Sequence, residues 1–182
     1  MKFDAISVTD KLGREIILRS AEATDAAALV EYLKITAGET PYLLREPEEV
    51  TMTPEQEIRF IKSKLEAARE LMLVATLDGK HIGNGSLMGI APFKRLAHRC
   101  EIAIALYQEY CNCGIGKVMV QTLLDTAKDL GYEQAELEVI AANEGAVALY
   151  EKLGFEKCGI LPRNMKYADG TYADAIHMMK VL

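Results

Sequence analysis

The sequence has few cysteines, few prolines and no excess of basic residues. Its 182 residues include four cysteines, five prolines and no tryptophan, and 21 Lys and Arg residues stand against 27 Asp and Glu residues, which gives a net charge of −6. Four irregularly spaced cysteines are too few for a disulfide framework in a chain of this length, so we expect reduced thiols. The acidic balance argues against a general nucleic-acid binder, which needs a basic surface to neutralise phosphates.

Long apolar runs are also missing. No stretch approaches the roughly 20 apolar residues that a membrane-spanning helix needs. The first 16 residues carry charges at Lys2, Asp4, Asp10 and Lys11, so they contain no apolar segment of a signal peptide. We therefore expect a cytoplasmic protein with no membrane partner. The prolines are scattered, and no repeat or linker stands out, which predicts a single domain over residues 1–182.

Hydrophobic periodicity and turn residues predict a mixture of strands and helices. We expect strands at residues 15–19, 71–77, 81–90, 99–106, 135–140, 155–161 and 172–181. Helices are expected after residue 25 as far as Gly38, after residue 53, at 115–130 and at 143–153. This order predicts a mixed α/β sheet with helices on its faces.

Two helix starts carry recognisable capping residues. Thr24-Asp25 offers an N-cap before an apolar segment with helical spacing. Thr53 can cap the next helix, Pro54 suits its first position, and Gln56 completes a capping box. Both sites therefore predict where a helix begins.

One hairpin is equally well marked. Asp78-Gly79 stands between two apolar runs, and Asp-Gly is a strong signal for a two-residue β-turn. Gly83 and Gly85 in the second strand indicate a bulge or a close backbone approach.

The most informative segment is a strand followed by a loop and a glycine-marked helix start. The strand ends at Leu106, and Gly114 and Gly116 open the helix. The first N–H groups of a helix have no partner within it and attract anions, so this segment suits a pyrophosphate. It is not a P-loop, because Val118 follows Gly-Lys, and it lacks the third glycine of the dinucleotide fingerprint, where Met119 stands. On its own the segment is equally compatible with a tight strand-to-helix turn.

A second motif lies about thirty residues further along the chain. Residues 143–155 read Asn-Glu-Gly-Ala-Val-Ala-Leu-Tyr-Glu-Lys-Leu-Gly-Phe. The two segments together resemble the signatures of the GCN5-related N-acetyltransferases (GNAT superfamily), Gln/Arg-x-x-Gly-x-Gly/Ala and Asn-x-x-Ala-x-x-Leu-Tyr-x-x-x-Gly-Phe. The second signature matches at every defined position, whereas Cys111 stands where the first has Gln or Arg. The resemblance covers residues 99–182, and this C-terminal half is similar to the ribosomal-protein N-terminal acetyltransferases.

The resemblance implies a GNAT-like acyl-CoA N-acyltransferase fold, with a central, mostly antiparallel twisted sheet and helices on both faces. It implies acetyl-CoA as cosubstrate, with its pyrophosphate on the loop and helix start, its pantetheine arm along the preceding strand, and its thioester carbonyl polarised by an N–H near Leu106. Asn143 would bond the pantetheine or hold two strands apart. The implied acetyl-CoA-binding residues are Ile104, Ala105, Leu106, Asn112, Cys113, Gly114, Ile115, Gly116, Lys117, Asn143 and Tyr150. Lys94 and Arg95 could meet the 3′-phosphate or could be solvated.

Acetyl transfer to an amine needs a base for the ammonium proton and an acid for the departing thiolate. The resemblance implies that Tyr150 is the acid; its alternative role is a core tyrosine. The resemblance implies Glu101 and Glu138 as the candidate bases. Their spacing to the two motifs predicts adjacent central strands, where burial would raise their pKa values. Either one could instead point outward or pair with Arg99, and Glu136 shares the face of Glu138.

The acceptor is expected to be a small-molecule or peptide amine, and the resemblance implies that residues 32–52 and 163–172 bind it. The protein could be a homodimer. Carboxylates such as Glu39 and Glu46 could attract a cationic amine or could be solvated. Tyr172-x-Asp174 is expected to fix the last hairpin. No metal site is expected, because Cys111-x-Cys113 is too tight for zinc and no second pair exists. The alternative to an enzyme is a non-catalytic acyl-CoA-binding or sensing module on the same fold.

Overall fold

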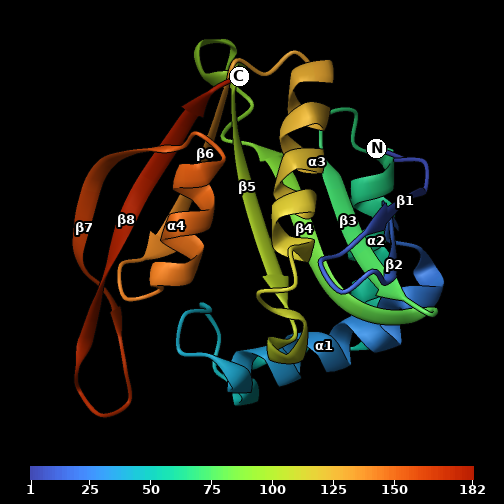
Figure 1. The fold of residues 1–182 in the computed structure, drawn as a ribbon, viewed down its shortest axis with the longest axis horizontal. Helices are drawn as coiled ribbons and strands as arrows, with labels where there is room; N and C mark the ends of the chain where they lie inside the picture. Colours follow the sequence, from blue (N-terminus) through green and yellow to red (C-terminus); the bar gives the residue numbers. More distant parts are fainter.

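The computed structural model describes all 182 residues. One sheet of eight strands runs through the molecule in the order β1-β2-β3-β4-β5-β6-β8-β7 (Figure 1). The strands are β1 (Ile6–Thr9), β2 (Glu15–Ser20), β3 (Leu71–Leu77), β4 (Lys80–Gly89), β5 (Arg99–Leu106), β6 (Gln134–Ile140), β7 (Glu156–Lys166) and β8 (Tyr172–Val181).

Four helices cover the two faces of the sheet. They are α1 (Ala26–Glu39), α2 (Pro54–Glu66), α3 (Ile115–Asp129) and α4 (Glu144–Lys152). Apolar side chains of α1 and α2 pack with Met72 and Val74 of β3 in one core cluster. The larger cluster joins α3 and α4 to inward-facing residues of β2–β6 and β8. The predicted fold class, with helices on both faces, is confirmed.

Every pair of neighbouring strands is antiparallel except β5 and β6. These two run parallel, and their register covers only Arg99–Gln134, Cys100–Ala135 and Glu101–Glu136. Beyond Glu101 the strands separate, as Figure 1 shows above the end of α1. Residues 102–106 of β5 therefore have a strand partner on the β4 side and none on the β6 side.

The hairpin and the second helix start are confirmed. Asp78 and Gly79 both have positive φ, 50° and 78°, as a primed turn between β3 and β4 requires. Thr53 accepts a hydrogen bond from the Gln56 N–H, and the Gln56 side chain accepts one from the Thr53 N–H. A bulge does interrupt the β3–β4 pairing, and a Cβ on Gly83 would lie 2.8 Å from the Ala105 carbonyl.

The first helix begins at the predicted residue, but without the predicted side-chain cap. Residues Ala23–Asp25 form a 3₁₀ turn, and α1 begins at Ala26 with no side-chain cap from Asp25. Both Asp25 oxygens instead accept hydrogen bonds from Arg19, at 2.7 and 2.8 Å. The Asp25 carboxylate therefore pairs with Arg19 of β2 and does not provide the cap of α1 that the sequence pattern predicts.

Two strand predictions also differ from the structure. The four-residue strand β1 was not predicted, because a segment this short carries little periodicity. Strand β7 continues past Leu161 to Lys166, through a register shift around Pro162. The Arg163 N–H donates to Asp174 of β8 at 2.8 Å, which holds the strand in place beyond the proline. Asp174 thus fixes the last hairpin, as predicted.

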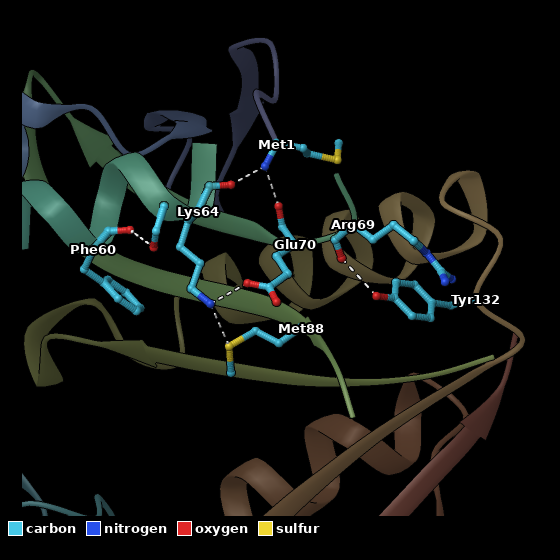
Figure 2. Close-up of polar contacts among 8 residues, drawn as sticks. Met1, Phe60, Lys64, Arg69, Glu70, Met88 and Tyr132 are labelled. Atoms are coloured by element: carbon cyan, nitrogen blue, oxygen red, sulfur yellow. Dashed lines mark hydrogen bonds and ion pairs between the residues drawn. The ribbon is translucent and has the colours of Figure 1, made fainter. Parts of the chain in front are cut away.

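A polar network ties the start of the chain to both layers (Figure 2). The amino group of Met1 donates to the backbone carbonyls of Lys64 in α2 and Glu70. The Lys64 ammonium contacts the Glu70 carboxylate and the Met88 sulfur of β4. Tyr132, after α3, donates to the Arg69 carbonyl at 3.0 Å. No helix in the structure has both the length and the apolar character needed to cross a membrane.

Candidate active site

The loop between β5 and α3 presents a row of free backbone donors. A 3₁₀ turn (Gln108–Tyr110) follows β5, and Gly114 then caps α3. None of the six N–H groups of residues 112–117 donates a hydrogen bond within the chain; the first helical bond is Val118 N–H to the Gly114 carbonyl, at 3.3 Å. Six adjacent unsatisfied donors at the positive end of a helix suit an anion such as a pyrophosphate. We call residues 112–117 the cradle.

Backbone conformation and small side chains shape the cradle. Asn112 and Gly114 adopt left-handed φ values of 62° and 89°, a geometry that turns successive N–H groups toward one side. A Cβ on Gly116 would lie 3.3 Å from Ile104 of β5 and 3.5 Å from Leu149 of α4. The glycine therefore lets the first turn of α3 pack closely between β5 and α4, beside the separated strands.

Tyr150 lies on α4 within the core cluster that contains α3. Only 8% of the residue is exposed, and its ring packs edge-on against Phe155 at 5.8 Å between centroids. No side chain or backbone group bonds its hydroxyl, yet the hydroxyl is not among the fully enclosed polar atoms, so it keeps access to solvent. Burial raises the pKa of Tyr150 to about 12, which keeps the phenol protonated at neutral pH.

Three glutamates share the opposite face of the sheet. Glu101 of β5 and Glu136 of β6 are register partners, and Glu138 follows two residues later, beside His177 of β8. Alternation along each strand places them on the face away from α3, whereas Ile104 and Leu106 lie on the α3 face. Beyond Glu101 and Glu136 no backbone pairing joins β5 to β6.

Glu136 is not available as a base. Both oxygens accept hydrogen bonds from Arg99, the Nη2 contact measuring 2.7 Å, and His177 Nε2 lies 3.3 Å away. The Arg99 guanidinium holds the pKa of Glu136 below its ordinary value. The predicted alternative of a pair with Arg99 therefore falls on Glu136, and neither Glu101 nor Glu138 forms an ion pair.

Glu101 has the opposite electrostatic environment. Partial burial raises its pKa, and the nearby charges of Glu138 and Glu136 raise it further. A carboxyl with a raised pKa accepts a proton more readily near neutral pH than an ordinary one. Glu101 and Glu138 are both exposed residues on this face. The structure thus places both candidate bases on one face without an ion pair, whereas Glu136 on the same face is paired with Arg99.

Asn143 has a structural role of its own. Its side-chain oxygen accepts a hydrogen bond from the Ala146 N–H at 3.3 Å and so caps α4. Cys111 and Cys113 lie in the loop before α3, and burial raises the pKa of the Cys111 thiol. No group of three or more His, Cys, Asp or Glu side chains comes together in a metal-binding arrangement.

Lys94 and Arg95 lie away from the cradle. They form a short 3₁₀ turn before β5, and Lys94 borders a cavity with Leu130 and Gly131 at the far end of α3. They precede the start of β5, whereas the loop that carries the cradle follows its end, and the eight residues of this strand span about 26 Å at roughly 3.3 Å per residue. This position does not suit a ligand bound at the start of α3.

Three hydrogen bonds hold the end of α1 and the segment after it, and no sequence pattern predicted them. The Gln108 N–H donates to Glu39 at 2.8 Å, the Tyr42 hydroxyl to the Ala142 carbonyl at 3.3 Å, and the Tyr167 hydroxyl to the Pro41 carbonyl at 3.0 Å. Further along, Glu46 and Glu49 form a capping box of a short 3₁₀ helix. Glu39, Glu46 and Glu49 therefore have structural partners, and the tyrosines hold this segment against the ends of β6 and β7.

The fold, with β5 and β6 separating beside the start of α3, is that of an acetyltransferase. Residues 34–155 match the acetyltransferase (GNAT) family. The chain belongs to this family, and the prediction of an N-acetyltransferase is confirmed.

Individual relatives agree with this assignment. An N-alpha-acetyltransferase of Sulfurisphaera tokodaii is 27% identical over 171 residues, which cover 88% of this chain and 90% of the relative. The ribosomal protein bS18 alanine N-acetyltransferase of Escherichia coli is 37% identical over 75 residues, covering 41% of this chain and 50% of the relative. The predicted similarity to ribosomal-protein acetyltransferases is thus present in part of the chain.

Solved structures share the whole fold. A GNAT acetyltransferase from Streptococcus pneumoniae is 28% identical with a TM-score of 0.87, over 92% of this chain and 100% of that one. A phosphinothricin acetyltransferase from Sinorhizobium meliloti, solved in complex with acetyl-CoA, is 22% identical with a TM-score of 0.79, over 91% of this chain and 87% of that one. The second likeness shows the fold alone.

Proposed function

We propose that this protein transfers the acetyl group of acetyl-CoA to a primary amine by direct attack of the amine on the thioester. The observation that carries the proposal is the cradle, whose six unpaired N–H groups follow a strand that lacks a partner on one side. The first feature suits a pyrophosphate, and the second suits an amide-containing arm that pairs with β5 as an added strand. Acetyl-CoA supplies both chemical groups together with the reactive acetyl thioester.

The residues on either face of the sheet have complementary roles in this proposal. Glu101 or Glu138 accepts the ammonium proton, directly or through water, and frees the amine lone pair for attack on the carbonyl carbon. A backbone N–H near Leu106 stabilises the negative charge that develops on the carbonyl oxygen. As the carbon–sulfur bond breaks, Tyr150 donates its phenolic proton to the thiolate. Tyr150 then regains a proton from solvent, which its hydroxyl can reach.

We propose an α-amine as the acceptor, in the first instance the N-terminus of a peptide. Two of the relatives are named for N-alpha acetylation and for acetylation of a ribosomal-protein alanine. The three glutamates on the sheet face away from α3 suit a cationic ammonium, because Arg99 neutralises the charge of Glu136 alone. This acceptor class is narrower than the amines that the sequence pattern left open.

Release of free thiol in the presence of acetyl-CoA and a panel of amines tests the proposal. The panel contains short peptides with free and with blocked N-termini, single amino acids, a polyamine and an aminoglycoside. We expect thiol release with free peptide N-termini and none with the blocked peptides. Binding of acetyl-CoA without thiol release for any amine would favour a sensing module; release with the polyamine alone would overturn the acceptor class.

A further inference from the structure

The turn between β1 and β2 lies against the cradle, although about a hundred residues separate them in the sequence. The Asp10 side chain fixes this turn by accepting hydrogen bonds from the N–H groups of Leu12 and Arg14, at 2.8 and 2.9 Å. The carboxylate also binds the Arg14 guanidinium, and the Asp10 side chain is fully buried. The turn is therefore a rigid support for the residue at its centre, Lys11.

Lys11 contacts the cradle with its backbone and with its side chain. Its N–H donates to the Cys113 carbonyl at 2.9 Å. Its aliphatic stem covers Gly114 so closely that a Cβ there would lie 3.1 Å from Lys11 Cγ. The ammonium reaches the Asn112 carbonyl at 3.4 Å, a long hydrogen bond that a better acceptor would replace.

Two other cations near this loop have carboxylate partners, whereas Lys117 of the cradle forms no ion pair. Arg14 pairs with Asp10 at 2.7 Å, and Lys80 pairs with Glu109 at 3.2 Å. Lys11 forms no ion pair with any carboxylate. It brings an uncompensated positive charge to a loop in which Cys111 supplies none.

We propose that Lys11 is a phosphate-binding residue of the cradle, whose ammonium moves from the Asn112 carbonyl to an oxygen of the bound pyrophosphate. The inference rests on the proposed function, since it needs acetyl-CoA in the cradle. Lys11 supplies from the first hairpin a cation in addition to Lys117 of the cradle itself. The hydrogen bond from the Lys11 N–H to the Cys113 carbonyl holds the turn against the loop.

The test is calorimetric titration of the full chain with three ligands: acetyl-CoA, its 3′-dephospho form, and S-acetylpantetheine, which has no phosphate. Lys11→Met keeps the apolar stem and removes the charge, Lys11→Arg keeps the charge, and Lys62→Met on exposed α2 is the matched control. We expect Lys11→Met to raise the Kd of acetyl-CoA and of the dephospho form by about tenfold, a change typical of one charge-assisted hydrogen bond. The Kd of acetyl-CoA for Lys11→Arg should stay within about threefold of the wild-type value, and Lys62→Met should not change it.

The ligand series separates this inference from the proposed function. If the wild type binds acetyl-CoA no better than S-acetylpantetheine, the proposal that the cradle binds a pyrophosphate is wrong. If the wild type prefers acetyl-CoA and Lys11→Met binds it equally well, the inference about Lys11 alone is overturned. A loss limited to the ligand with the 3′-phosphate would overturn the assignment to the pyrophosphate. Equal melting temperatures of the ligand-free variants exclude a folding defect as the cause of weaker binding.

Discussion

At the scale of single residues, Tyr150 has the environment of a proton donor. A buried phenol with its hydroxyl open to solvent and a pKa near 12 stays protonated until a strong base forms beside it. We expect Tyr150→Phe to lower kcat by about 100-fold, the usual contribution of a positioned acid, and to leave the Kd of acetyl-CoA within twofold. Steady-state kinetics and calorimetry measure the two quantities. Tyr132→Phe, at another buried tyrosine far from the cradle, serves as control, and an unchanged kcat for Tyr150→Phe would remove Tyr150 from the mechanism.

The raised pKa of Glu101 predicts a pH dependence of turnover. Burial and the charges of Glu138 and Glu136 move this pKa above 4.5, the value of an ordinary glutamate. Below the raised pKa Glu101 is protonated and can accept no further proton, so kcat falls as the pH decreases. We expect Glu101→Gln to lower kcat and to abolish this acidic limb of the profile. A limb that survives in Glu101→Gln and disappears in Glu138→Gln would identify Glu138 as the base.

At the scale of elements, the Arg99–Glu136 pair joins β5 to β6 just before they separate. Glu136 is 3% exposed at its side chain, so Arg99→Met leaves an almost buried carboxylate without its main partner. Because Arg99 is itself 31% exposed and Gln134 still donates to the Glu136 carboxylate, we expect a loss of about 1–2 kcal/mol in the free energy of unfolding at pH 7, below the cost of breaking a fully buried pair. Chemical denaturation measures this free energy.

The same pair predicts the sign of a pH effect on stability. The pKa of Glu136 is lowered in the folded state, so the pair stabilises fully above the unfolded value near 4.5 and is lost as the pH falls through the folded value. The difference between wild type and Arg99→Met should therefore shrink at acidic pH. A difference that grows below pH 4.5 would contradict this account of the pair.

The segment after α1 offers a test of acceptor binding. Tyr42 and Tyr167 hold it against the ends of β6 and β7 through their hydroxyls, which bond the carbonyls of Ala142 and Pro41. In Tyr42→Phe/Tyr167→Phe the segment loses both bonds, and we expect the KM for the acceptor to rise about fivefold, the equivalent of about 1 kcal/mol. The Kd of acetyl-CoA should not change. A change in the Kd of acetyl-CoA alone would show that the segment acts on the cradle.

At the scale of the whole molecule, local patterns predicted the elements well and their long-range contacts poorly. The capping box at Thr53, the turn at Asp78-Gly79 and the starts of α3 and α4 depend on neighbours in sequence, and the structure confirms them. The partners of Asp25, Glu136 and Lys11 lie between 6 and 101 residues away. Alternation along a strand fixed the shared face of the glutamates, but it could not say which of them Arg99 binds.

The family resemblance indicated which residues form the cradle, and the structure shows which of their backbone groups are free to bind a ligand. A sequence motif names Gly114 and Gly116, but only the structure shows that six consecutive N–H groups are unpaired and that β5 lacks a partner beside them. Lys11 carries no motif at all, because the contact that brings it to Gly114 depends on the position of the first hairpin in the sheet.

The central claim is that the backbone N–H groups of residues 112–117 bind the pyrophosphate of acetyl-CoA. A titration of the ¹⁵N-labelled protein with acetyl-CoA, followed by amide chemical shifts, tests it most directly, since each N–H reports separately. The account predicts the largest shifts at these six amides, and their disappearance when S-acetylpantetheine replaces acetyl-CoA while the amides of β5 still respond. Shifts centred elsewhere, or cradle amides that respond equally to the ligand without phosphates, would contradict it.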